Sequence, residues 1–139
     1  MYFRRSFINP AKEKNLSGRK MSSKVLKMAD FLKVKIVKLE SGAKYQRLFN
    51  KDSGTGGMKS GHVILKEGEE IGEHSTNDLE EALVVLKGSG QLVVNSENAI
   101  NFEADMVLCV PPGTIHNVKN TGRGILEYIF ITSYAYEKK

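Results

Sequence analysis

The chain has 139 residues, of which 40% are hydrophobic, and its formal net charge is +5. Its single cysteine excludes an internal disulfide, and no apolar run approaches the roughly 20 residues that a membrane-spanning helix needs. The length and composition are typical of one soluble domain with its own core, and the first residues lack the apolar region of a secretory signal, so we expect a cytoplasmic protein.

Positive charge is concentrated toward the N-terminus. Residues 1–40 hold 11 Lys and Arg against 3 Asp and Glu, whereas residues 41–139 hold 10 against 13. A basic segment can touch phosphate non-specifically, but no zinc-finger spacing, helix-turn-helix pattern or interleaved aromatic residues accompany it. We therefore predict a flexible basic arm over residues 1–21, a single domain over residues 22–139, and no specific nucleic-acid partner. A weaker alternative is that the arm docks on an acidic protein surface.

The first structured elements are predicted after the arm. Serine caps and helical spacing of apolar residues favour a short helix over residues 22–32, although a strand over part of this stretch fits nearly as well. Residues 33–40 alternate charged and apolar side chains and predict a half-buried strand, and residues 44–49 predict a second one. Residues 50–57 are rich in glycine and small polar residues, which indicates an exposed, mobile loop.

Short strands then follow one another to the end of the chain. They are bounded by Gly, Pro and Asn turn residues, and no long amphipathic helix separates them. The predicted strands span residues 61–66, 82–87, 91–94, 106–110, 116–119 and 125–134. This spacing is typical of an antiparallel sandwich or barrel.

The strand after Glu81 is apolar on both of its faces. Leu83 and Val85 share the Glu81 face, while Val84 and Leu86 share the other. The barrel interior covers one face, so a second sheet, the N-terminal segment or a partner subunit has to cover the other. We therefore predict a homodimer.

Two histidine-containing motifs carry the chemistry of the chain. They read Gly68-x5-His74-x-Thr76-x4-Glu81-x6-Gly88 and Pro111-x-Gly113-x2-His116-x3-Asn120. In order and spacing they resemble the paired motifs of the cupin superfamily, over roughly residues 41–133. The resemblance to small, single-domain cupin-2-like proteins implies an all-β fold, the double-stranded β-helix or jelly-roll barrel.

The resemblance also implies a metal site. Cupins hold a metal ion with two histidines spaced His-x-His, a glutamate of the same motif and a histidine of the second motif. Carried over to this chain, the ligands are His74, Glu81 and His116, while Thr76 stands at the second histidine position. Two imidazoles and one carboxylate match non-haem Fe(II) centres and catalytic zinc sites. The implied cofactor is a divalent transition metal: iron, manganese, zinc, nickel or copper.

Thr76 leaves an alternative open, in which the two histidines are hydrogen-bonded core residues of a barrel that has lost its metal. Against this, an inward-facing Glu81 is costly to bury without a cation. The resemblance thus implies a small metal-dependent enzyme of dioxygenase, isomerase or decarboxylase type, acting on a small organic molecule. The alternative is a non-catalytic cupin that binds a sugar or another small molecule beside a degenerate metal site.

Several other residues carry narrower expectations. Thr76 is a candidate to hydrogen-bond the ligand or a bound water, and Tyr45, Gln46 and Tyr128 are further candidates for ligand contact. His62 is predicted to lie at the surface or the barrel rim. Cys109 is predicted to be a small buried apolar group, and Asp105 stands where cupins usually place a glycine, which predicts a change in that turn.

Overall fold

A computed structural model of the chain describes residues 22–24 and 32–136. Its packing divides the chain into two compact units, Met1–Lys33 and Val34–Lys139. All strands of the described residues belong to the second unit. Among the described residues, no helix has the length and hydropathy needed to span a bilayer.

The predicted arm, residues 1–21, lies outside the described residues. Its flexibility and the domain boundary after residue 21 therefore stay predictions. Ser23 and Lys24 are helical, but residues 25–31, which would form most of the predicted helix, also lie outside.

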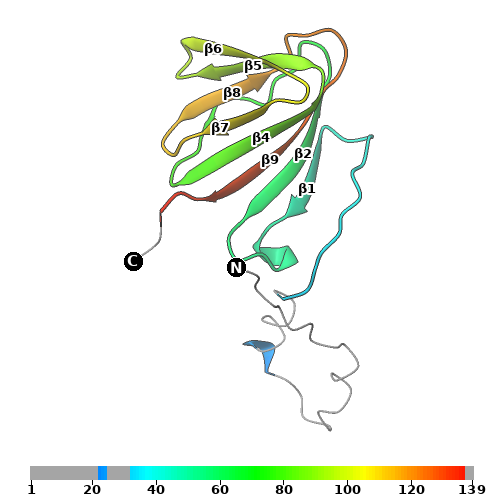
Figure 1. The fold of residues 1–139 in the computed structure, drawn as a ribbon, viewed down its shortest axis with the longest axis vertical. Coiled ribbons are helices and arrows are strands. Elements are labelled where there is room, and N and C mark those ends of the chain that lie inside the picture. The colour runs from blue at the N-terminus through cyan, green and yellow to red at the C-terminus, as the bar shows by residue number, and fades with distance from the viewer. Residues whose placement is uncertain (1–21, 25–31, 137–139) are drawn as a thin grey trace, which may run out of the picture. The chain divides into compact units, whose positions relative to one another are not determined.

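Nine strands and one short 3-10 helix make up the described part of the second unit (Figure 1). One antiparallel sheet has the order β1-β2-β9-β4-β7 and the other has the order β3-β8-β5-β6. The elements are β1 (Tyr45–Phe49), the 3-10 helix η2 (Lys51–Ser53), β2 (Lys59–Leu65), β3 (His74–Ser75), β4 (Leu79–Lys87), β5 (Ser89–Val94), β6 (Asn98–Glu103), β7 (Val107–Val110), β8 (Ile115–Lys119) and β9 (Leu126–Tyr134). The predicted all-β, double-stranded β-helix fold is confirmed.

The hydrophobic core is built from inward-facing strand positions. In β4, Leu83 and Val85 are buried, whereas Val84 is half-buried and Leu86 is 40% exposed. This two-residue alternation is the pattern expected when one face of a strand packs inward. The buried hydrophobic residues are Val63, Leu65, Leu83, Val85, Leu92, Phe102, Val110, Val118, Leu126 and Tyr128.

Residues 34–40 do not form the predicted strand. Val34 and Ile36 are 92% and 91% exposed, and the segment has no backbone ladder to the sheet. A side chain holds it instead: the Gln46 amide oxygen accepts a hydrogen bond from the Glu40 N–H at 2.9 Å, and Gln46 Nε2 donates to the Lys38 carbonyl at 3.0 Å. The alternating pattern predicted an extended backbone but could not specify whether a strand partner was available.

Strand β6 was not predicted, because it begins within a run of turn-forming residues and only its last four residues alternate between apolar and polar. It is the edge strand of the four-stranded sheet, and Phe102 is its only buried residue. The turn that follows contains Asp105 at φ 69°, a left-handed conformation that favours glycine. Aspartate therefore keeps the kind of conformation that a glycine would adopt at this position.

Two predictions about the outer face of the five-stranded sheet were wrong. His62, in β2 between β1 and β9, is only 1% exposed, and its Nε2 lies 2.6 Å from the Glu127 carboxylate. Cys109 is exposed rather than buried. It lies in β7, at the sheet edge, and pairs with Ala82 on the outward side.

Candidate functional site

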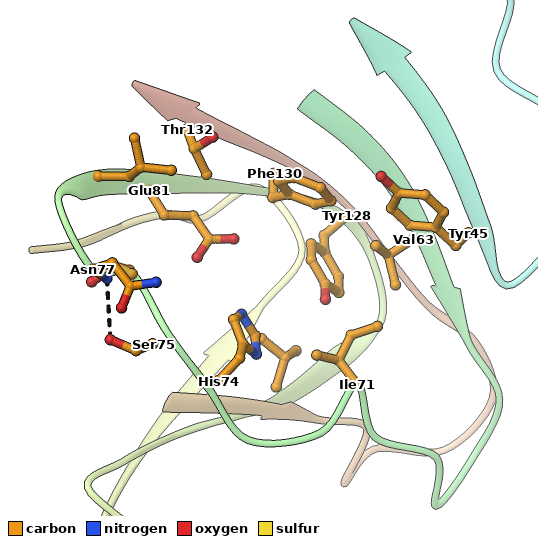
Figure 2. A pocket seen from close by; sticks show the side chains of 13 residues that line it. Tyr45, Val63, Ile71, His74, Ser75, Asn77, Glu81, Tyr128, Phe130 and Thr132 are labelled. Carbon is orange, nitrogen blue, oxygen red and sulfur yellow. Dashed lines mark hydrogen bonds between the residues drawn. The ribbon is translucent and has the colours of Figure 1, made fainter. Parts of the chain in front are cut away.

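The structure brings the three predicted metal ligands together. His74 in β3 pairs directly with His116 in β8, and their ring centroids are 4.3 Å apart. Glu81 reaches the same point from β4 in the other sheet. One ligand atom from each residue lies within 4.8 Å of the others. Figure 2 shows the Glu81 carboxylate and the His74 ring pointing into a common cavity.

Backbone carbonyl groups orient both imidazole rings. His74 Nδ1 lies 2.9 Å from the Gly72 carbonyl oxygen, and His116 Nδ1 lies 3.2 Å from the Thr114 carbonyl oxygen. A carbonyl only accepts, so each Nδ1 carries a hydrogen and donates it. In the neutral tautomer this leaves Nε2 with a free lone pair, which is the arrangement that metal-ligating histidines use.

The contact between His116 and Glu81 calls for a cation. His116 Nε2 is buried without a hydrogen-bond partner, yet it lies 3.0 Å from Glu81 Oε2. An imidazole lone pair and a carboxylate at this distance repel unless positive charge stands between them. A proton is one solution: burial acts to lower the His116 pKa, but Glu81 and the Thr114 carbonyl raise it, and the net pKa lies above the ordinary value. A metal ion is the other, so the residues present fit a metal.

Thr76, which stands at the position of the missing histidine, has a structural role. Its side chain is buried, and its hydroxyl donates to the Pro111 carbonyl at 2.8 Å while accepting from the Thr114 N–H at 2.9 Å. The hydroxyl thus ties the first motif to the turn that precedes His116. Its only proton is committed to the backbone.

Two of the three ligands, His74 and Glu81, line a cavity of about 270 Å³, whereas His116 is not part of its lining. Its lining comprises Tyr45, Val63, Ile71, His74, Ser75, Thr76, Asn77, Leu79, Glu81, Val118, Tyr128, Phe130 and Thr132. The predicted contact residues Tyr45, Thr76 and Tyr128 are among them. Gln46 is not, because it follows Tyr45 in β1 and points to the opposite face, where it binds residues 38–40.

Sequence reasoning missed Phe130, which completes the aromatic wall of the cavity. Phe130 stacks on Tyr45, with ring centroids 6.1 Å apart and planes at 16°. Both rings lie over Gly61, where any side chain would collide with them. The signal was present in the alternation of β9, since Tyr128, Phe130 and Thr132 share one face.

Comparisons with known proteins agree with this geometry. The family model for the cupin domain matches residues 61–132. An RmlC-like cupin family protein from Methanocaldococcus jannaschii is 21% identical with a TM-score of 0.63, covering 73% of this chain and 91% of that one. A Cupin 2 conserved barrel domain protein from Salinispora arenicola is also 21% identical, with a TM-score of 0.61 and coverage of 74% and 91%.

A third similar structure has a more specific title. It is a predicted oxalate decarboxylase from Thermotoga maritima, 21% identical with a TM-score of 0.54, covering 71% of this chain and 99% of that one. At this level of identity the structures show a shared fold. No curated protein matches the sequence. With the family model covering 61–132, about half of the sequence, and the barrel and paired motifs in place, the chain belongs to the cupin domain family.

Proposed function

We propose that this protein binds a divalent transition metal through His74, Glu81 and His116 and takes a small organic molecule into the adjoining cavity. The observation that carries the proposal is the buried, unbonded His116 Nε2 beside the Glu81 carboxylate. Three ligand atoms gathered within 4.8 Å leave the remaining coordination positions to water or a bound molecule.

A metal-dependent enzyme of dioxygenase, isomerase or decarboxylase type is the activity we propose. A metal ion at this site would polarise a ligand oxygen atom. The chain's own residues would do the rest: backbone carbonyls fix the imidazole rings, Glu81 supplies the negative charge, and apolar walls keep water from the ligand. Iron, manganese, zinc, nickel and copper all accept this ligand set.

A second candidate is a non-catalytic cupin that binds a sugar or another small molecule beside a degenerate metal site. The hydrogen bonds of Thr76 favour it, because the fourth ligand position of the family pattern is occupied by a side chain with a structural role. Metal content separates the two candidates.

The test is metal analysis by inductively coupled plasma mass spectrometry on tag-free protein. We expect near-stoichiometric metal in the parent protein and its loss in His116→Ala. The matched control is His62→Asn, which alters a buried histidine outside the site and should keep its metal. A parent protein that remains metal-free after reconstitution would refute the metal site and leave the binding module.

We also propose that the protein forms a homodimer. The outer face of the five-stranded sheet carries Ala82 and Val84 of β4 beside Ile129 and Ile131 of β9, all half-buried, and Val107 of β7 is 67% exposed. An apolar sheet face of this kind is a preferred contact surface. A second copy of the chain is the occupant that we propose for it.

A further inference from the structure

We propose that the cavity selects an uncharged organic molecule, with an aromatic or aliphatic body and a hydroxyl or carbonyl oxygen, over a small carboxylate such as oxalate. This names the ligand class of the proposed site and so rests on the proposed function; of the three activity types proposed above, it disfavours the decarboxylase type, whose substrate is a carboxylate. Three features of the cavity carry it: the charge of its lining, the chemistry of its walls, and the Tyr128 hydroxyl.

The lining offers an anionic ligand hydroxyl, amide and imidazole groups but no permanently cationic side chain. Within residues 22–24 and 32–136, no lysine or arginine lines the cavity, and the carboxylate present, Glu81, is negative. Arg47 shares a face of β1 with Tyr45 but is not part of the lining. A dianion would meet the Glu81 charge with only the metal ion to offset it. Without the metal ion, the charge of such a ligand would stay unpaired in the cavity, which disfavours its binding.

The walls suit an apolar body. Val63, Leu79 and Phe130 face the cavity from the five-stranded sheet, and Val118 faces it from the other, with Ile71 between. A group the size of a water molecule occupies about 30 Å³. The cavity of about 270 Å³ therefore has room for a single substituted ring or a short aliphatic chain. Contact with these side chains would stabilise binding in proportion to the apolar surface of the ligand that is removed from water.

Tyr128 supplies the polar contact that would orient such a molecule. Its hydroxyl points into the cavity beside His74 in Figure 2, although the residue is only 2% exposed. Among the described residues, none makes a hydrogen bond to this hydroxyl, so its donor is available to a ligand oxygen.

The experiment compares phenol with benzoate and oxalate. Binding of each is followed by amide NMR titration, in metal-free protein and in zinc-loaded protein whose metal content is measured separately. We expect phenol to bind at least tenfold more tightly than benzoate in both forms, and oxalate to leave the metal-free spectrum unchanged. Tyr128→Phe should weaken phenol binding about three- to tenfold, as expected for one hydrogen bond, without changing the affinity for toluene. Tyr136→Phe, altered outside the cavity, is the matched control and should behave as the parent.

The outcomes separate this inference from the metal proposal. If the protein holds no metal but still prefers phenol, the ligand class stands and the metal site fails. If the protein holds metal and benzoate or oxalate binds as tightly as phenol, the ligand class is wrong and the metal site stands. Anion binding that disappears in Arg47→Gln would also overturn the inference, because it would place a cation in the ligand site.

Discussion

At the scale of single residues, the contact between Glu81 and His116 can be tested by replacing the Glu81 carboxylate with an amide. Glu81→Gln replaces a charged acceptor with an amide that can donate a hydrogen to His116 Nε2, 3.0 Å away. We expect zinc affinity to fall more than about tenfold, since even the loss of a ligand's hydrogen-bond partner costs about 10- to 100-fold. At a pH above the raised pKa of His116, where no proton separates the two groups, the metal-free variant should be at least as stable as the metal-free parent. Calorimetric zinc titration and thermal unfolding in chelator measure the two effects, and a metal-free variant that unfolds earlier would count against the repulsion described here.

Among single residues, the motif spacing predicted the metal ligands but not the other residues that line the cavity. His74, Glu81 and His116 could be identified because two independent motifs fix their places. Gln46 could not be excluded from the cavity, because a shift of one residue in strand register reverses the face on which a side chain lies. The role of Thr76 was equally hidden, since its partners belong to a turn 35 or more residues away.

Among the secondary-structure elements, the turn between β6 and β7 offers the sharpest test. Asp105 adopts φ 69°, which a β-branched residue strongly resists. Asp105→Val should lower the free energy of unfolding by about 1–2 kcal/mol, whereas Asp105→Gly should leave it nearly unchanged. Urea denaturation measures both, and equal stability of the two variants would mean that the turn relaxes freely.

The strands themselves were predictable where both a core face and a pairing partner exist. β4 and β9 lie inside the five-stranded sheet, and their long apolar runs gave clear signals. Residues 34–40 alternate over much of their length but have no ladder partner, whereas β6 pairs with β5 although only its last four residues alternate. The local sequence pattern indicates which side chains are buried, whereas the arrangement of the whole sheet determines which strands pair.

At the scale of the whole molecule, the proposed homodimer through the outer face of the five-stranded sheet can be tested directly. Val107 is 67% exposed at the end of a row that also contains Val84 and Ile129. Light scattering should give twice the monomer mass for the parent protein and the monomer mass for Val107→Asp, because a charge in the contact is costly. Ile100→Asp, on an exposed position of β6 in the other sheet, is the matched control and should remain dimeric. A monomeric parent would exclude this interface.

The hydrogen bonds of Thr76 also limit how easily the site can change. A histidine at this position would add a ligand atom, but it would leave the Pro111 carbonyl and the Thr114 N–H without their present partner. Unpaired buried groups of this kind cost about 1–3 kcal/mol each. The substitution that restores the family's ligand set would therefore loosen the turn that positions His116. A mutational path back to four ligands has to cross a less stable protein, unless that turn changes first.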